Sequence, residues 1–175
     1  MEETIAIINQ IIDEHKVILR HTHDLEQVAN DAEAMMTLDK SKEVFMPGRL
    51  DQGYGLQKFQ ELWVMVEEGL KAHFNKEETQ LLAAFQKDGD EKLVTTLQTL
   101  LLEHKDIRDR FNQEKKFIAT LTTGQISRNI WQATAHDLRA HITHTRKLLE
   151  AHAEIEQELL HTMRKKITEA QEGIH

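Results

Sequence analysis

The sequence predicts an all-α fold, an up-and-down antiparallel four-helix bundle, and three observations support this prediction. Only one proline and seven glycines interrupt the 175 residues, and residues that favour helices dominate the composition. Apolar residues recur every three or four positions through four long segments, which is the pattern of amphipathic helices. Short links join the second, third and fourth segments, so these helices must run antiparallel to one another. We expect a single domain, residues 1–175.

The first helix is predicted for residues 3–36, because Ile8, Ile11 and Leu19 share one face. The connection that follows, residues 37–55, is the one long link and contains the only proline. We expect it to form an ordered cap, with its apolar VFM stretch folded over one end of the bundle.

The second helix is predicted for residues 56–86, where Trp63 and Leu70 lie on the apolar face. The turn KDGDEK follows, and its Gly89 suits the position just past a helix end. The third helix is predicted for residues 91–121, which keep the same apolar periodicity.

The fourth helix is predicted for residues 128–166, with Leu138 and Leu149 on its apolar face. It comes after the break TTGQIS, in which Gly124 ends the preceding helix and Ser127 is suited to cap the next. The tail beyond the fourth helix is expected to fray.

Composition excludes several classes of function. The formal charge of −8 argues against nucleic acid as a partner, and no apolar run approaches the roughly 20 residues that a membrane span needs. The N-terminal MEETIAIINQ is acidic, unlike a signal peptide. The chain has no cysteine, which excludes disulfides and thiolate-bound metals. A cytoplasmic location is therefore expected.

Eleven histidines stand out in this composition, and each predicted helix places one of them on its apolar face. These four are His15, His73, His104 and His141, and Glu77 lies one turn after His73. A single buried histidine is usually a core residue that is hydrogen-bonded to a neighbour. Four of them, one on each helix, indicate a shared site.

Counting residues from the turns places these histidines at similar depth in the bundle. His73 lies 16 residues before Gly89, and His104 lies 15 residues after it. From Gly124, His104 is 20 residues back and His141 is 17 residues forward. At about 1.5 Å per residue the mismatches amount to a few ångströms. The four imidazoles and the carboxylate can therefore meet in one layer.

Imidazole and carboxylate together suit iron, manganese, zinc or copper better than magnesium or calcium. Four histidines and one carboxylate leave one position of an octahedron free for a small ligand, which differs from a closed structural zinc site. Glu77 can bind the same ion as His73 or bridge to a second one.

His152 and Glu156 repeat the His-x-x-x-Glu spacing further along the fourth helix. The same count places them in a layer with Thr4, Ala84 and Leu93, none of which can complete a site. We therefore interpret them as a buried or bundle-end polar pair. No His-Glu-x-x-His, phosphate-binding loop or nucleophile elbow occurs, so a conventional enzyme is not expected.

Several segments around these histidines resemble the hemerythrin-like, or HHE cation-binding, family. HFNKEE (73–78) resembles the family's His-x-x-x-Glu motif, and LLLEHKDIRDRF (100–111) is similar to the Glu-His-x-x-x-Arg segment of one branch. LRAHITHTRKLLEAH (138–152) resembles the fourth-helix segment, in which a histidine before isoleucine is a ligand. His15, which follows a glutamate, resembles the first-helix ligand.

The resemblance implies a bundle that holds non-haem iron, with one or two iron ions per chain. It implies these metal ligands: His15, His73, Glu77, His104 and His141. The expected function is binding of O₂, peroxide or nitric oxide at an open metal position, for sensing, storage or detoxification. Weak oxidase or peroxidase-type turnover is a further possibility.

Two positions depart from the family pattern. Arg108 stands where oxygen carriers have a second histidine, and Thr145 stands where the family has a bridging acid. Arg108 can pair with Glu77, with an anionic ligand or with a carboxylate at the bundle surface. A second ion then has few ligands left, namely Glu77 as a bridge, His144 and water, so a mononuclear or asymmetric di-metal site is one alternative. The alternative function is a degenerate bundle that acts as an interaction module, with an empty or non-iron site.

Overall fold

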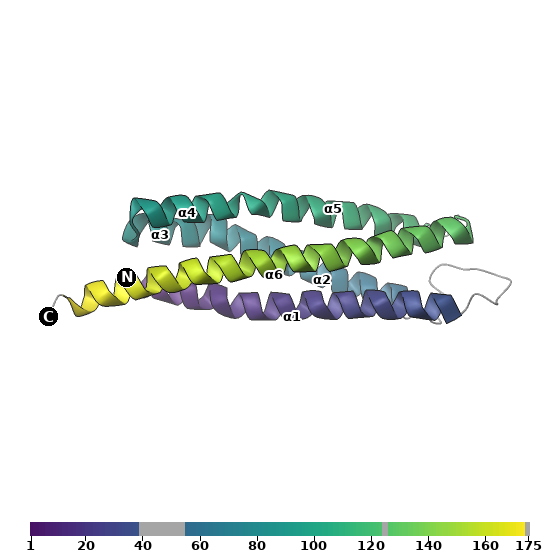
Figure 1. Ribbon diagram of the computed structural model, residues 1–175, viewed down its shortest axis with the longest axis horizontal. Helices are drawn as coiled ribbons and strands as arrows, with labels where there is room; N and C mark the ends of the chain where they lie inside the picture. Colours follow the sequence, from purple (N-terminus) through teal and green to yellow (C-terminus); the bar gives the residue numbers. More distant parts are fainter. Residues whose placement is uncertain (39–54, 124–125, 174–175) are drawn as a thin grey trace.

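The computed structural model describes residues 1–38, 55–123 and 126–173, and it confirms the predicted all-α bundle (Figure 1). No strand occurs among these residues. The VFM stretch and Gly124 lie outside them. The elements are α1 (Glu2–Leu38), α2 (Gly55–Lys76), the π-helix η2 (Glu77–Leu81), α3 (Leu82–Asp88), α4 (Glu91–Leu101), α5 (Glu103–Thr122) and α6 (Arg128–Glu172).

The four rods of the bundle are α1, then α2–η2–α3, then α4–α5, and finally α6. α1 packs against α2 and α6, and α5 packs against α6, so each rod lies beside its neighbours around a closed bundle. The N- and C-termini lie at the same end as the turn between α3 and α4 (Figure 1). This arrangement brings four helix faces to one interior.

Local signals end the helices as the sequence predicted. Gly89 is extended after α3, and the side chain of Asp90 accepts a hydrogen bond from the Leu93 N–H at 2.9 Å. Ser127 is confirmed as the cap of α6, because its hydroxyl accepts from the backbone N–H of Ile130. The predicted end of this helix was too early: α6 continues to Glu172, since Ile167 is buried and holds the last turns.

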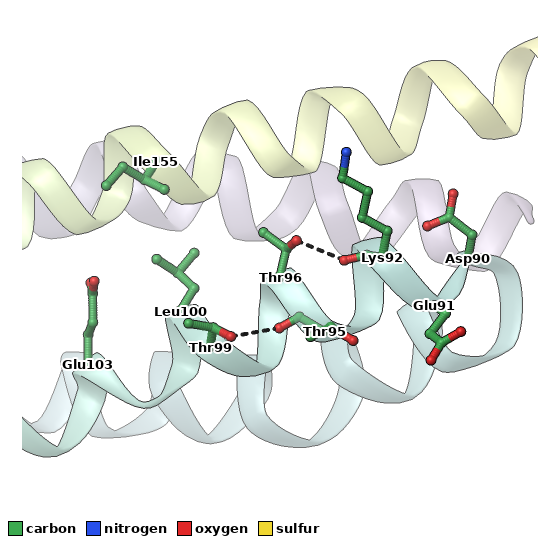
Figure 2. Close-up of a pocket in the computed structure, with 9 residues that line it drawn as sticks. All are labelled: Asp90, Glu91, Lys92, Thr95, Thr96, Thr99, Leu100, Glu103 and Ile155. Atoms are coloured by element: carbon green, nitrogen blue, oxygen red, sulfur yellow. Dashed lines mark hydrogen bonds between the residues drawn. The ribbon is translucent and has the colours of Figure 1, made fainter.

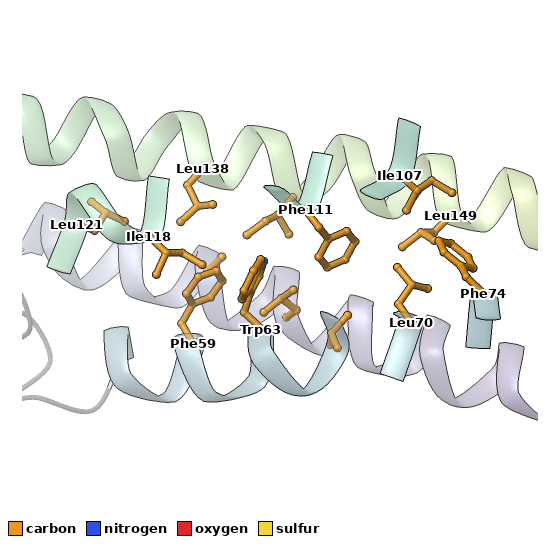
Figure 3. Close-up of a cluster of buried hydrophobic side chains, with 14 of the residues drawn as sticks. Phe59, Trp63, Leu70, Phe74, Ile107, Phe111, Ile118, Leu121, Leu138 and Leu149 are labelled. Carbon is orange, nitrogen blue, oxygen red and sulfur yellow. The ribbon is translucent and has the colours of Figure 1, made fainter. Parts of the chain in front are cut away.

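Two apolar clusters fill the interior. The aromatic cluster lies toward the α5–α6 turn (Figure 3), and it includes Phe59, Trp63, Leu70, Phe74, Ile107, Phe111, Leu138 and Leu149. The aliphatic cluster lies toward the termini and includes Ile8, Ile11, Leu81, Phe85, Leu97, Leu160 and Met163. Polar side chains separate the two clusters.

Two helices are irregular at the level where the clusters part. The π-helix begins at Glu77. The backbone N–H of Leu82, the residue just after the π-helix, donates to the carbonyl of Glu77. On the adjacent rod, the N–H of Leu102 bonds to the carbonyl of Thr99, which makes a tighter turn between α4 and α5. Such irregular turns change the direction of nearby side chains and are frequent at functional sites.

Gly89→Ala should destabilise the protein by about 1–3 kcal/mol. A Cβ at this position would lie 2.6 Å from the carbonyl oxygen of Phe85, and that oxygen already accepts the Gly89 N–H. Gly69→Ala is the matched control, because it has open space in a helix and should be neutral or stabilising by about 0.5–1 kcal/mol. Urea unfolding measures both variants, and equal stabilities would contradict the packing argument.

Candidate metal centre

Six buried side chains meet between the two apolar clusters, and we refer to them as the candidate centre. They come from all four rods of the bundle, and none is more than 5% exposed. They are His15 of α1, His73 of α2, Glu77 of η2, His104 of α5, and His152 and Glu156 of α6.

Glu77 lies in the middle of this group. Its Oε1 is 2.5 Å from Nε2 of His73 and 3.3 Å from Nε2 of His15. Its Oε2 is 2.8 Å from Nε2 of His104. One carboxylate therefore contacts imidazoles from three different helices.

Glu156 contacts imidazoles from two helices, α1 and α6. Its Oε2 lies 3.4 Å from Nε2 of His15 and 3.3 Å from Nε2 of His152. The Nε2 atoms of His152 and His104 are 3.2 Å apart. All four imidazoles thus turn the same nitrogen, Nε2, toward the interior.

Two subsets of the centre can each hold a metal ion. The first is His15, His73 and Glu77, and the second is Glu77, His104 and His152. Within each subset the possible ligand atoms lie within 4.8 Å of one another. Since Glu77 belongs to both subsets and Glu156 contacts a histidine of each, the arrangement suits two neighbouring ions bridged by carboxylates.

Three of the four imidazoles contact a carboxylate through Nδ1, the ring nitrogen that faces away from the centre. Nδ1 of His73 is 2.8 Å from Glu14, Nδ1 of His104 is 2.8 Å from Glu78, and Nδ1 of His152 is 2.7 Å from Glu103. Hydrogen bonds of this kind fix which nitrogen of a histidine faces a metal, and they make that nitrogen a better ligand. Each carboxylate comes from the neighbouring rod.

The fourth imidazole, that of His15, breaks this pattern, because its Nδ1 is buried and has no hydrogen-bond partner. Beside it is a small cavity lined mainly by apolar side chains, and its free volume for a water-sized sphere is about 10 Å³. It is lined by His15, Ile18, Leu19, Leu70, His73, Phe74, Leu149, His152 and Ala153. This volume is at the lower limit for one water-sized molecule beside three imidazoles.

Arg108 pairs with a surface carboxylate, which was one of the alternatives open from the sequence. Its guanidinium lies 2.8 Å from Oε1 of Glu78, the residue that also holds His104. It lies over the ring of Phe74, which in turn stacks on His104 with ring centroids 3.7 Å apart. Arg108 therefore supports His104 from outside the centre.

The structure brings four of the five predicted ligands together but not His141. The imidazole of His141 is 21% exposed, and its Nδ1 lies 3.7 Å from Glu114, in a different layer of the bundle. Thr145, predicted beside the centre, donates its hydroxyl to the His141 carbonyl. His144 is exposed.

His152 and Glu156, interpreted from the sequence as a separate polar pair, lie in the layer of His104 instead. His141 and His152 are eleven residues apart, about three helical turns, so they share one face and periodicity cannot distinguish them. Side chains lean toward the N-terminus of their own helix. The side chain of His104 therefore leans away from the α5–α6 turn, and the side chain of His152 leans back toward this turn. The two rings thus come closer along the bundle axis than their residue numbers indicate. The repeated His-x-x-x-Glu spacing was the signal that pointed to this pair.

The unpaired atoms and charges of the centre fit a metal ion. Both carboxylate oxygens of Glu156 and Oε2 of Glu77 are fully buried without a well-aligned hydrogen bond, although imidazole nitrogens lie within 3.4 Å of Glu77 Oε2 and Glu156 Oε2. Burial would raise the pKa of Glu77, yet contacts with imidazoles, that of His104 foremost, hold this pKa well below its usual value. Ionised, buried carboxylates beside imidazoles are the ligands that divalent transition metals prefer.

When no metal is bound, carboxylate neighbours favour protons on three of the imidazoles, those of His15, His73 and His152. Burial would lower the pKa of His15, but the carboxylates of Glu156 and Glu77 outweigh burial and raise it from 6.5 to about 9. The pKa values of His73 and His152 are also raised, against burial, by their carboxylate neighbours. Metal binding must displace these protons, so metal affinity should rise with pH.

A surface groove of about 800 Å³ lies between α4 and α6 (Figure 2). Thr96 and Thr99 point their hydroxyls back to carbonyls of their own helix, so they offer little to a ligand. At one end of the groove is Glu103, which holds His152.

In the described part of the chain, no helix is long and apolar enough to cross a bilayer.

The fold and this group of side chains define a four-helix-bundle protein whose histidines and glutamates can hold metal ions. The family model of the hemerythrin HHE cation binding domain matches residues 6–164. The chain therefore belongs to the hemerythrin HHE cation-binding family. Searches of curated proteins and of solved structures found no match.

The metal-free protein should lose stability as the pH rises from 6.5 to 9. The pKa of His15 is higher in the folded chain than its ordinary value of 6.5, so protonated His15 stabilises the fold fully below pH 6.5. This contribution, about 3 kcal/mol at about 1.4 kcal/mol per pKa unit, disappears as the pH rises through about 9. Urea unfolding of chelator-treated protein at several pH values measures it.

The metal-loaded protein and a metal-free His15→Gln variant are the two controls. The metal-loaded protein should not show this decline, since ions replace the protons. The variant should show a smaller decline, because His15 no longer titrates while His73 and His152, whose pKa values are also raised, still do. A metal-free wild-type protein that is equally stable at pH 6.5 and 9 would contradict the role of His15.

Proposed function

We propose that the protein is a non-haem iron protein that binds a small ligand such as O₂, peroxide or nitric oxide, for sensing, storage or detoxification. The observation that carries the proposal is the candidate centre itself. It combines four inward Nε2 atoms with two fully buried carboxylates, and a cavity of about 10 Å³ lies beside it. Iron, when bound, supplies an electron donor and acceptor and an attachment point for such ligands.

The proposed ligands divide between two iron ions. His15 and His73 serve one ion, His104 and His152 serve the other, and Glu77 is shared between them. Glu156 contacts one histidine of each pair and is the second shared carboxylate. Two nitrogens and two oxygens would leave positions open at an octahedral iron ion, whereas the same four ligands would complete a tetrahedral zinc ion.

The surrounding residues orient the ligands and restrict access. Glu14, Glu78 and Glu103 hold three imidazoles by Nδ1, which keeps their Nε2 lone pairs directed inward. Leu70, Leu149 and other apolar side chains line the cavity. Their apolar surface disfavours water, and the small volume of the cavity excludes larger molecules. The cavity adjoins His15, His73 and His152, and a ligand in it would lie beside both proposed metal positions.

The alternative function, a degenerate interaction module, rested on Arg108 and Thr145. Arg108 supports His104 through Glu78, and Glu156 supplies the second carboxylate that Thr145 could not. Neither residue therefore argues against a two-metal centre. We favour the iron-binding function.

Protein purified without added metal should contain about two iron ions at the centre, and His152→Ala should remove at least one of them. The reason is that His152 is one of two imidazoles in its subset. His144→Ala is the matched control, since this histidine is exposed on the same helix and should leave the iron content unchanged. Elemental analysis and the visible spectrum provide the readout. A colourless, iron-free protein that takes up no Fe(II) anaerobically would overturn the proposal.

Ala153→Leu should weaken or slow nitric oxide binding by about tenfold or more, which corresponds to about 1.4 kcal/mol. The added carbons would enter the small cavity beside His15, while the iron ligands remain. Ala151→Leu on the exposed face of the same helix is the control. Spectral titration with nitric oxide, together with iron content, tests this. Unchanged ligand binding in Ala153→Leu would show that the cavity is not the ligand site.

A further inference from the structure

The small cavity beside His15 is too tight for a diatomic ligand unless part of its lining moves. Its free volume of about 10 Å³ is at the lower limit for one water-sized molecule. Seven of its nine lining residues are buried, and only Ile18 and Leu19, adjacent on α1, are partly exposed. Packed interiors resist the displacement of buried side chains. The part of the lining that can move is therefore formed by Ile18 and Leu19.

A second surface groove, which we call the α1–α2 groove, lies against this part of the lining. It has a volume of about 650 Å³, and most of its exposed lining is apolar. Ile18 and His73 line both the groove and the cavity, whereas Leu19 lines the cavity alone. The wall that separates the groove from the cavity therefore consists of Ile18 and His73.

These two side chains differ in how firmly they are held. Nε2 of His73 is 2.5 Å from Glu77, and its Nδ1 is 2.8 Å from Glu14. Glu14 in turn pairs with Lys76, which also lines the groove. The side chain of Ile18 is aliphatic, so its displacement breaks no hydrogen bond. Of the two, only Ile18 can move away without the loss of a polar contact.

The α2 side of the groove is open at the level of Ile18. α1 and α2 run antiparallel (Figure 1), and the ring centroids of His15 and His73 are 4.8 Å apart. Ile18 comes three residues after His15 and Gly69 comes four residues before His73, so both lie about one turn from this contact in the same direction. A Cβ at Gly69 would meet no heavy atom within 4 Å. No α2 side chain at this position therefore obstructs the approach to Ile18.

We propose that an uncharged diatomic gas, such as O₂ or nitric oxide, enters the cavity from the α1–α2 groove when the Ile18 side chain moves aside. The identity of the ligand rests on the proposed function, and the route rests on the lining that the groove and the cavity share. Such gases lose little hydration in an apolar passage, whereas a polar ligand such as peroxide loses much more. Ile18 thus determines which ligands reach the centre and how fast.

Nitric oxide kinetics with the iron-loaded protein test this route. Ile18→Ala should raise both the association and the dissociation rate constants by about tenfold, which corresponds to about 1.4 kcal/mol in the barrier. Gly69→Leu should lower both rate constants, because its side chain would occupy the groove, and Gly69 does not line the cavity. The iron content should not change in either variant, since neither residue is a proposed ligand.

Two control variants carry comparable changes outside the α1–α2 groove. Ile155→Ala removes the same atoms from an exposed residue of α6, and Glu68→Leu places a leucine at an exposed position next to Gly69. Both should bind nitric oxide at wild-type rates. Wild-type rates in Ile18→Ala and Gly69→Leu, at unchanged iron content, would overturn the route.

A second measurement needs no iron and separates this inference from the proposed function. Dissolved O₂ is paramagnetic and speeds the nuclear relaxation of the methyl groups that it approaches. In the metal-free chain, the effect of O₂ on the Ala153 methyl, which lines the cavity, should increase in Ile18→Ala and stay at the wild-type level in Ile155→Ala. The absence of this increase would overturn the route, whereas an iron-free protein would overturn only the proposed function. Circular dichroism verifies that each variant is folded.

Discussion

The rest of the structure depends on two carboxylates, Glu77 and Glu156, that are completely buried in the middle of a helical bundle. An ionised carboxylate is costly in such a place unless cations or hydrogen-bond donors surround it. Here four imidazoles supply that environment, one from each rod of the bundle. In the metal-free chain, the raised pKa values of His15, His73 and His152 favour protons on these rings, which balance the charge, and metal ions would balance it in the loaded chain. The same contacts therefore serve folding and metal binding.

Pairs of adjacent residues build the support of this centre. Glu14 precedes His15, Glu78 follows Glu77, and Glu103 precedes His104; in each pair one residue enters the centre. The other residue of each pair holds an imidazole from the next rod. Each of the first three rods thus orients an imidazole of the rod that follows it in the chain. The series stops at His15, whose Nδ1 has no hydrogen-bond partner and beside which the small cavity lies.

The apolar clusters fix the relative positions of the helices at this polar layer. The aromatic cluster packs on one side of it and the aliphatic cluster on the other, so the helices cannot slide without disturbing both. The π-helix at Glu77 and the tight turn at Leu102 occur on adjacent rods at this level. They direct adjacent residues, such as Glu77 and Glu78, to opposite nitrogens of the same imidazole, that of His104.

The sequence by itself determined the bundle, its helix ends near Gly89 and Ser127, and the faces that carry histidine. These follow from local periodicity and capping, which need no knowledge of distant contacts. Tertiary structure alone decided that His152, and not His141, joins His104. Both lie on one face of α6, and only the packing of α6 against α5 sets which turn meets the centre. The contacts of Glu14, Glu78 and Glu103 were equally hidden, because a surface-type glutamate reveals its partner only when the neighbouring helix is in place.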